Sequence, residues 1–402
     1  MVEFSLARLP RIEFGNGKLS LLPSLISHYG ENTLLVTGES SFVQSENWAV
    51  LLEELERRKI VWHHATVCGE PLAEDMDSIS ERFRSQNIQS VVGIGGGSAL
   101  DAAKAIAGLL RVPNSVLDYL EGVGPELPYQ GPAVPLIAVP TTAGTGSEAT
   151  KNAVLSRYGE HAFKKSFRDE ALVAQYALVD PSLLASCSEQ VVAANGMDAL
   201  TQLIESYVSI KANTFNDALV ISGLRAARDG LLTTFHHAGE SHATTDETVK
   251  SARSHMAYAA LISGISLAQV GLGSVHGLAS PLGAFFPIPH GVVCGTLVAS
   301  ATRININAMN QREPNNIALS RYARVAEVLC EKRMRDPEQA HTALVDLLTN
   351  WTETMRLPRL SAYGVNSDAI DRVVKNSRGS SMKTNPIVLQ DEEIASIVKD
   401  RL

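Results

Sequence analysis

The chain has 402 residues, of which 45% are hydrophobic, and a formal net charge of −8 at pH 7. This length exceeds one typical compact core and predicts two domains. The acidic balance argues against nucleic acid or an anionic membrane as a partner, and no apolar run approaches the roughly 20 residues of a membrane span. The first residues lack the charged-then-apolar pattern of a leader. Four widely spaced cysteines predict a reduced, cytoplasmic location.

Short β-branched runs alternate with helical stretches from about residue 33 to residue 180. Such alternation, with continuous apolar strands, predicts a parallel sheet with helices on both faces. In chain order we expect strand 32–38, helix 45–58, strand 60–67, helix 76–87, strand and loop 90–97, helix 98–110 and strand 135–142.

From about residue 188 the strand signals fade and long amphipathic helices dominate, for example over 188–209 and 246–270. The sequence therefore predicts an α/β plus all-α architecture. An amino-terminal Rossmann-like parallel-sheet domain is expected over residues 1–185 and a carboxy-terminal helical domain over 186–402.

Three loops that follow expected strands are rich in glycine or hydroxyl side chains: VTGESS, GIGGGS and PTTAGTGSE. Glycine lets the backbone approach a ligand closely, and the helix that begins near Ser98 offers free N–H groups to a phosphate. Open α/β sheets bind nucleotides at the ends of neighbouring strands. We therefore expect a bound dinucleotide, although the second loop is not the GxGxxG fingerprint.

The end of the first expected strand bears on the choice between NAD and NADP. An acid at this point would bind the ribose 2′-hydroxyl and repel a 2′-phosphate. Gly38 occupies the turn and is followed by Glu39, Ser40 and Ser41. The small residues favour NADP mildly, whereas Glu39 as a ribose ligand would favour NAD. An ordinary turn without ligand contact is the structural alternative.

Four residues of the expected helical domain have the chemistry of a divalent-metal site. Asp198 and Gln202 are four apart and share one face of a helix, while His276 and His290 flank a Gly/Pro-rich stretch. A carboxylate and two imidazoles bind a cation that polarises oxygen. Because a carboxamide is a weaker ligand than imidazole for Fe(II) or Zn(II), Gln202 leaves metal binding open. A helix-dipole role for Asp198 and structural roles for the histidines are the alternatives.

Several segments resemble the iron-containing (group III) alcohol dehydrogenases, in the same order: GIGGGSALDAAKAIA, PLIAVPTTAGTGSEATKNAVL, YALVDPSLL, GMDALTQLIESYVS, GLGSVHGLASPLGAFFPIPHGVVCGTL and SMKTNPIVLQDEEIASIV. The resemblance runs from about Phe14 to the carboxy terminus. It implies a nucleotide-binding α/β domain, a helical metal-binding domain, a cofactor in the cleft between them, and commonly a homodimer. The implied reaction is hydride transfer between a nicotinamide and an alcohol or aldehyde.

Two positions depart from the family pattern, in which the metal ligands are one aspartate and three histidines. The second ligand falls on Gln202, and a further family histidine falls on Ser280. The resemblance implies Asp198, Gln202, His276 and His290 as ligands, and His276 and Ser280 as catalytic residues. The loops and the resemblance together give the expected cofactor-binding residues: Gly38, Ser40, Gly95, Gly96, Gly97, Ser98, Asp101, Thr141, Thr142, Thr145, Asn152 and Lys164.

Other functions remain open at this point. A metal-independent reductase similar to maleylacetate reductase is the main alternative, and basic residues lining the cleft would favour it. A lyase similar to dehydroquinate synthase would need extra basic residues, which the segments around Gln202 and Ser280 lack. For Lys164 a solvated surface role is an equal alternative to a contact with the cofactor ribose. A non-catalytic dinucleotide-binding protein would show no turnover with aldehydes.

Overall fold

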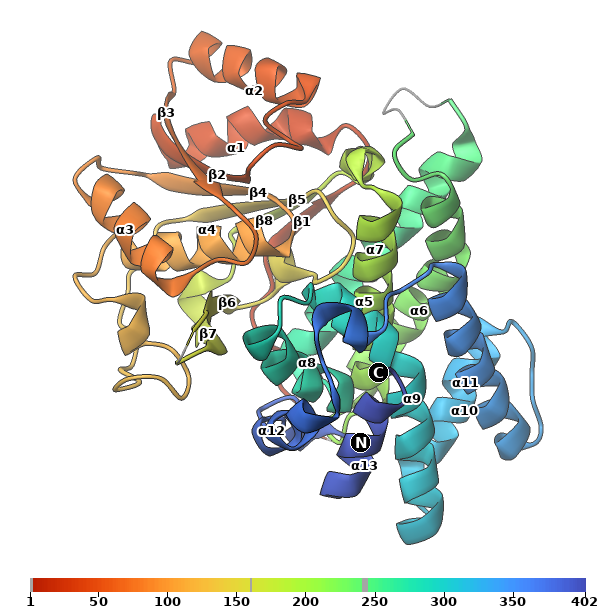
Figure 1. The fold of residues 1–402 in the computed structure, drawn as a ribbon. Coiled ribbons are helices and arrows are strands. Elements are labelled where there is room, and N and C mark those ends of the chain that lie inside the picture. Colours follow the sequence, from red (N-terminus) through yellow and green to blue (C-terminus); the bar gives the residue numbers. More distant parts are fainter. Residues whose placement is uncertain (1–2, 160, 241–244) are drawn as a thin grey trace. The chain divides into compact units, whose positions relative to one another are not determined.

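The computed structural model describes residues 3–159, 161–240 and 245–402. The chain divides into two compact units, which we call the sheet unit and the helical unit (Figure 1). The sheet unit comprises Ala7–Ser186 and Glu240–Asp246, and the helical unit comprises Met1–Leu6, Cys187–Gly239 and Glu247–Leu402.

The sheet unit is built on a six-stranded parallel sheet in the order β1-β8-β5-β4-β2-β3. This arrangement confirms the predicted parallel-sheet fold. The strands are β1 (Arg11–Phe14), β2 (Asn32–Gly38), β3 (Val61–Val67), β4 (Ser90–Gly95), β5 (Leu136–Pro140) and β8 (Tyr176–Val179), and the helices are α1 (Leu22–Tyr29), α2 (Glu46–Arg57), α3 (Ala73–Arg84) and α4 (Gly97–Leu109).

Helices cover both faces of this sheet (Figure 1). Successive side chains of a strand point to opposite faces. In β2, Leu34 and Val36 belong to a buried cluster with residues of α3 and α4, whereas Leu35 packs with residues of α1 and α2. Each fully buried side chain of this kind contributes roughly 1.5–3 kcal/mol. The continuous apolar runs seen in the sequence are therefore explained by burial on two sides.

The strands β2, β4 and β5 are neighbours, and they end at the same edge of the sheet. Gly95, the last residue of β4, pairs in register with Pro140 at the end of β5, and Thr37 of β2 pairs with Ile94. The three polar loops expected to bind the dinucleotide therefore leave the sheet side by side.

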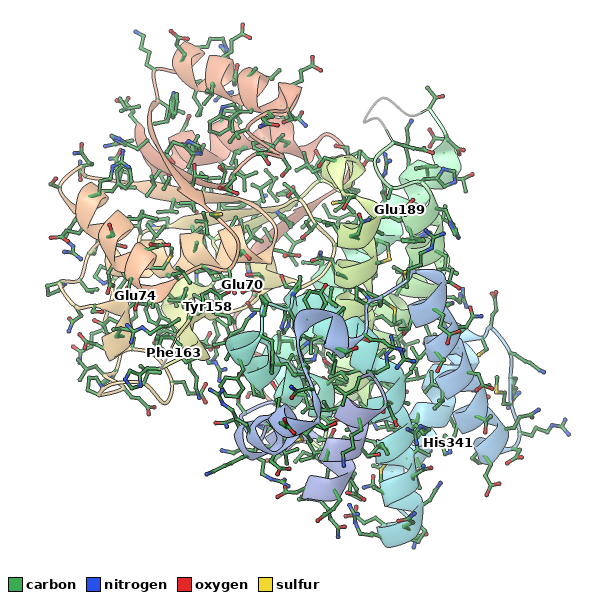
Figure 2. The ribbon with its side chains drawn as sticks, viewed as in Figure 1. Glu70, Glu74, Tyr158, Phe163, Glu189 and His341 are labelled. Atoms are coloured by element: carbon green, nitrogen blue, oxygen red, sulfur yellow. The ribbon has the colours of Figure 1, made fainter. Side chains whose placement is uncertain are left out.

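An antiparallel hairpin of β6 (Asn152–Arg157) and β7 (Phe163–Arg168) was not among the expected elements, nor were β1, α1 and β8. Figure 2 shows Glu70 and Glu74 near the hairpin residues Tyr158 and Phe163. Glu74 forms an ion pair with Arg157. These contacts attach the hairpin to the segment that leads into α3.

The helical unit begins with α5, whose first turn is capped by the Ser188 hydroxyl accepting from the N–H of Val191 at 3.3 Å. Among the described residues no single helix is long and apolar enough to cross a membrane; α7 and α8 meet that test only as a pair bent by 99°. The helices are α5 (Glu189–Val208), α6 (Thr214–His236), α7 (Glu247–Val270), α8 (Ser274–Phe285), α9 (His290–Arg312), α10 (Ile317–Leu329), α11 (Pro337–Thr354), α12 (Ile370–Asn376) and α13 (Asp391–Lys399).

Candidate functional site

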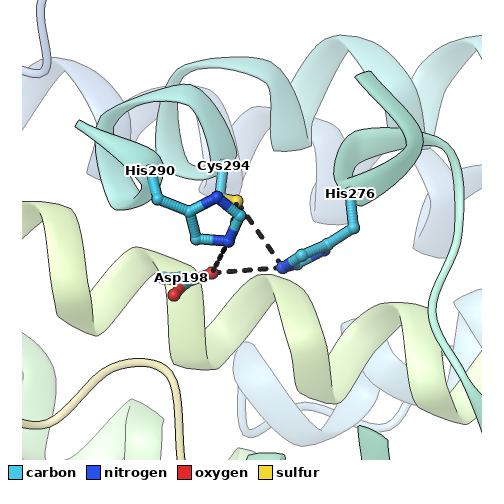
Figure 3. Close-up of side chains that lie close together, drawn as sticks. All are labelled: Asp198, His276, His290 and Cys294. Atoms are coloured by element: carbon cyan, nitrogen blue, oxygen red, sulfur yellow. Dashed lines mark hydrogen bonds and ion pairs between the residues drawn. The ribbon is translucent and has the colours of Figure 1, made fainter. Parts of the chain in front are cut away.

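Three helices of the helical unit bring four donor side chains together (Figure 3). Asp198 lies in the middle of α5, His276 in the first turn of α8, and His290 is the first residue of α9. Cys294 follows His290 by one turn of α9, so both side chains lie on the same face of that helix. We call these four residues the donor cluster.

The atoms of the donor cluster are close enough to share one cation. One donor atom from each residue lies within 4.8 Å of the others. Asp198 Oδ1 is 3.2 Å from His276 Nε2 and 3.9 Å from His290 Nε2. Cys294 Sγ is 3.6 Å from His276 Nε2 and 3.8 Å from His290 Nε2 (Figure 3). The His290 side chain is 27% exposed while the other three are buried, so solvent reaches the cluster at His290.

Two glycines allow α9 to approach α5 at this point. A Cβ atom on Gly291 would lie 2.5 Å from the carbonyl oxygen of Ala194, and a Cβ on Gly295 would lie 2.7 Å from Cβ of Met197. Each glycine adjoins a donor: Gly291 follows His290, and Gly295 follows Cys294. Because these two glycines have no side chains, α9 packs closely enough on α5 for His290 and Cys294 to lie next to Asp198.

The first turn of α8 is held by side chains from distant parts of the unit. Glu205 Oε1 accepts from the N–H of Val275 at 2.7 Å, and Asn385 Oδ1 accepts from the N–H of Ser274 at 3.0 Å. The second oxygen of Glu205 is 2.7 Å from Nδ1 of His276. A carboxylate on one ring nitrogen fixes the ring and directs the other nitrogen toward a metal. His276 is thereby oriented with Nε2 toward Asp198.

The charges of the cluster favour a cation. Burial would raise the pKa of Asp198, but the charge of His290 and the hydrogen bond with His276 hold it below its ordinary value. Burial would lower the pKa of His276, but Cys294, Asp198 and Glu205 raise it well above its ordinary value. Burial raises the pKa of the Cys294 thiol to about 12. The two buried carboxylates, Asp198 and Glu205, thus favour positive charge on His276, which a metal ion would supply in place of the ring proton.

In the sheet unit, the glycine loop after β4 lies against the loop after β5. A Cβ on Gly96 would be 3.3 Å from Oγ1 of Thr142, and a Cβ on Gly97 would be 2.7 Å from Cγ2 of Thr145. Ser98 lies in the first turn of α4, where backbone N–H groups are free to meet an anion. The structure therefore brings together the expected phosphate-binding residues of these two loops.

Behind the two loops lies a buried network centred on Lys104. Its Nζ donates to Ser147 Oγ at 2.6 Å, to Thr150 Oγ1 at 2.9 Å and to the Asn152 carbonyl at 2.6 Å, and forms an ion pair with Asp101 at 3.2 Å. Burial lowers the pKa of Lys104 against the opposing charge of Asp101. The other oxygen of Asp101 accepts from the N–H of Val154. Asp101 and Asn152, expected at the cofactor, thus also join α4 to the second loop and β6.

The loop after β2 is open at its start. A Cβ on Gly38 would meet nothing within 4 Å. The neighbouring carboxylate of Glu39 raises the pKa of the exposed Cys68 thiol. Ser41 from the loop after β2 and Thr141 from the loop after β5 line the same pocket. Ser40 precedes Ser41 in the chain. Lys164 lies elsewhere, in β7, where its Nζ is 2.8 Å from Glu70 Oε1.

Both units match one family of enzymes. The model of the iron-containing alcohol dehydrogenases matches residues 10–181, and that of the carboxy-terminal part of the Fe-containing alcohol dehydrogenase family matches residues 192–402. The chain belongs to the iron-containing alcohol dehydrogenase family. This confirms the predicted family and the predicted class of oxidoreductase, and the maleylacetate reductase alternative is not favoured.

Individual relatives agree with this assignment. Alcohol dehydrogenase 4 of Schizosaccharomyces pombe is 31% identical over 394 residues, covering 97% of this chain and 87% of that protein. The NAD-dependent methanol dehydrogenase of Bacillus methanolicus is 30% identical over 324 residues, covering 80% and 79%. The crystal structure of an archaeal halo-thermophilic Red Sea brine pool alcohol dehydrogenase superposes with a TM-score of 0.89 at 25% identity, covering 100% and 99% of the two chains.

Within this iron-containing alcohol dehydrogenase, the two unusual positions are buried or half-buried. Gln202 lies on α5 one turn after Asp198, and its Oε1 accepts from the hydroxyl of Ser263 at 2.9 Å. Ser280 lies on α8 one turn after His276 and is half-buried. The oxygen of Gln202 that would be the ligand atom is therefore already engaged with a neighbouring helix.

Two residues at the site were missing from the sequence-based set. Cys294 follows His290 by four positions, the same helical spacing that had linked Asp198 to Gln202. Glu205 lies seven residues after Asp198, again on the same face of α5. The helical period would have found both if it had been applied to α9 and carried one turn further along α5.

The residues present fit a divalent cation. Carboxylate, imidazole and thiol are the donors that bind Fe(II) and Zn(II). Asp198 Oδ2 is buried and has no hydrogen-bond partner among the residues that the structure describes. A buried carboxylate oxygen without a donor is costly, and a cation would compensate it. Asp198, His276 and His290 would hold such an ion.

Proposed function

We propose that this chain is an NAD(P)-dependent alcohol dehydrogenase that interconverts an alcohol and its aldehyde. In the oxidative direction the carbinol carbon gives a hydride to the nicotinamide ring, and the hydroxyl proton passes to solvent. The observation that supports this proposal best is the donor cluster around Asp198, in a chain of the iron-containing alcohol dehydrogenase family. The phosphate-binding loops of the sheet unit support the cofactor part.

The side chains of the helical unit have distinct tasks in this reaction. A divalent cation bound there supplies a Lewis acid that polarises the oxygen of the alcohol or aldehyde. Asp198 would contribute the negative charge that retains it, and His276 and His290 would contribute ring nitrogens after giving up their protons to solvent. Glu205 orients His276 through the 2.7 Å contact to Nδ1. Ser280 passes the proton, although a hydroxyl is less well matched to that task than imidazole.

We further propose that the chain accepts NADP(H) as well as NAD(H). The space beside Gly38 at the end of β2 is open, which leaves room for a 2′-phosphate. The methanol dehydrogenase relative is NAD-dependent by name, so use of NAD is expected too.

The test is aldehyde reduction followed by the absorbance of NADH and NADPH, with protein purified without chelator and loaded with Fe(II) or Zn(II). We expect turnover of at least one short aliphatic aldehyde with both cofactors. Metal content is measured on the same samples. No turnover across a panel of aldehydes and alcohols with either metal would contradict the proposed reaction.

We also propose that the protein acts as a homodimer, as the family resemblance implies, and that it is cytoplasmic, as its widely spaced cysteines indicate. Light scattering of the purified protein is expected to give twice the chain mass of 43.2 kDa. A monomer mass at micromolar concentration would contradict the dimer.

A further inference from the structure

Cys294 is placed as a fourth donor in the donor cluster. Its Sγ lies at similar distances from two imidazole nitrogens, 3.6 Å from His276 and 3.8 Å from His290. A tetrahedral zinc site with bonds of about 2.0–2.3 Å has neighbouring donor atoms about 3.3–3.6 Å apart. The separations around Asp198 Oδ1, 3.2 and 3.9 Å, fall around the same values. Four of the six separations among these atoms are therefore at or within a few tenths of an ångström of the tetrahedral values, and all six lie within 4.8 Å.

The position of the thiol follows from the helix that carries it. His290 and Cys294 are one turn apart on α9, so the backbone that places one donor also places the other. Because Gly291 and Gly295 have no side chains, this face of α9 packs directly against α5. Cys294 is fully buried, in contrast to Cys68, which is exposed on the sheet unit.

Gln202 is the competing source of a fourth donor. It occupies the position of a family histidine, but its Oε1 already accepts from Ser263 at 2.9 Å. A carboxamide oxygen is also a weaker ligand for these metals than a thiolate. The chain thus combines a weak donor on α5 with a strong donor on α9.

We infer that Cys294 would hold the metal through Sγ, together with the carboxylate of Asp198 and the imidazoles of His276 and His290, and that the substrate oxygen would add to these four protein donors during the reaction. The thiol gives its proton to solvent on binding, and the sulfur donates a lone pair. Gln202 then stays outside the ligand set and supports the site through Ser263. The inference deepens the metal site of the proposed function and rests on it. Thiolate is the softest donor of the set, which makes the site more selective for Zn(II) over Fe(II).

The first test uses Co(II) as a spectroscopic probe of the wild-type protein after exhaustive chelation. A thiolate ligand gives a sulfur-to-cobalt charge-transfer absorption in the near ultraviolet, which nitrogen and oxygen donors do not give. We expect this absorption at one equivalent of Co(II). If Co(II) binds without it, the inference is overturned, whatever the activity of the protein.

The second test compares variants by Zn(II) competition with a chromophoric chelator. Cys294→Ser is expected to weaken Zn(II) binding by at least about tenfold, the lower end of the effect of changes outside the ligand shell. Cys330→Ser is the matched control because it removes a half-buried thiol of the same unit that is not part of the donor cluster. Unchanged affinity in Cys294→Ser together with a large loss in Gln202→Ala would assign the fourth position to Gln202 and refute the inference.

A double variant separates ligand loss from a packing defect. Gln202→His places an imidazole one turn after Asp198, the position of the family ligand. In the Cys294→Ser background it should restore Zn(II) affinity without restoring the cobalt charge-transfer absorption. It should also lower the preference for Zn(II) over Fe(II) relative to wild type. Hydride transfer is measured separately with NADH and NADPH, so failure of the thiolate assignment leaves the dehydrogenase proposal standing.

Discussion

Glycine has opposite uses in the two units of this protein. At the edge of the parallel sheet, a Cβ on Gly38 would meet no described atom within 4 Å, and the nearest atoms to a Cβ on Gly96 belong to one side chain, that of Thr142 at 3.3 Å. In α9, the spaces beside Gly291 and Gly295 are filled by α5 and its neighbours. The first use prepares a surface for a ligand, and the second brings protein donors together. A glycine-rich motif therefore indicates that something packs closely against the backbone. Whether that is a ligand or another helix of the protein can be seen only in the fold.

The largest effect is expected for Gly291→Ala. Its new Cβ would lie 2.5 Å from the backbone oxygen of Ala194, and backbone cannot rotate away. We expect α9 to shift, with a loss of about 1–3 kcal/mol of stability. Zn(II) affinity should fall by more than about 100-fold, the upper limit for changes outside the ligand shell, because His290 and Cys294 move together.

Thermal unfolding and Zn(II) titration of the same samples test this prediction. Gly379→Ala is the matched control, since a Cβ there meets nothing within 4 Å. Wild-type Zn(II) affinity in Gly291→Ala would show that the approach of α9 to α5 does not set the donor geometry.

Gly96→Val tests the opposite use. A β-branched side chain would fill the space expected for the pyrophosphate, and its Cβ starts 3.3 Å from Thr142. If the new side chain costs the bound state about 1–3 kcal/mol of steric strain, the dinucleotide affinity falls roughly tenfold to hundredfold. Gly96→Ala should lose much less. Fluorescence titration with NADH and NADPH measures the effect, and equal affinities in all three proteins would move the cofactor away from this loop.

Glu205→Gln asks whether the donor cluster depends on a carboxylate behind it. Loss of the charge that faces His276 Nδ1 should weaken Zn(II) binding by about 10–100-fold while the fold is retained. Glu189→Gln is the control on the same helix, because Glu189 is exposed at its first position (Figure 2). If both variants bind Zn(II) alike, Glu205 only caps α8.

Gly38→Asp is expected to have the smallest effect. The space is open, so the fold should accept the side chain. Like charges about 5 Å apart at a partly exposed site repel by about 1–3 kcal/mol, which predicts a roughly tenfold shift of kcat/KM from NADPH towards NADH. Gly38→Asn has nearly the same size without the charge and should shift the ratio little. An unchanged ratio in Gly38→Asp would place the ribose elsewhere.

The sequence predicted the parts of the fold that have a strong period. The expected strand 32–38 coincides with β2, and the expected helix 188–209 differs from α5 by one residue at each end. The β6–β7 hairpin was not predicted because its strands lack a continuous apolar run and β7 carries charged residues such as Lys164 and Arg168. Their pairing depends on contacts with Glu70 and the segment before α3, which no local pattern contains.

For the site, Asp198, His276 and His290 were found from residue chemistry and from the family resemblance, and the structure brings them together. Cys294 was missed because the family pattern directed attention to Gln202, where a histidine was absent. The position of a donor depends on which helix faces it across the core. The close packing of α9 against α5 determines that Cys294 faces Asp198. This packing is possible because Gly291 and Gly295 have no side chains.

The hydrogen bond from the Ser274 backbone to Asn385 links positions 111 residues apart in the chain. During synthesis at roughly 5–20 residues per second, the turn that carries His276 exists for on the order of ten seconds before Asn385 is made. Until then one backbone N–H at the start of α8 lacks its acceptor, and that turn frays. A growing chain therefore emerges from the ribosome with an incomplete binding site. The turn that orients His276 is therefore expected to be complete only late in synthesis, after the chain has passed Asn385.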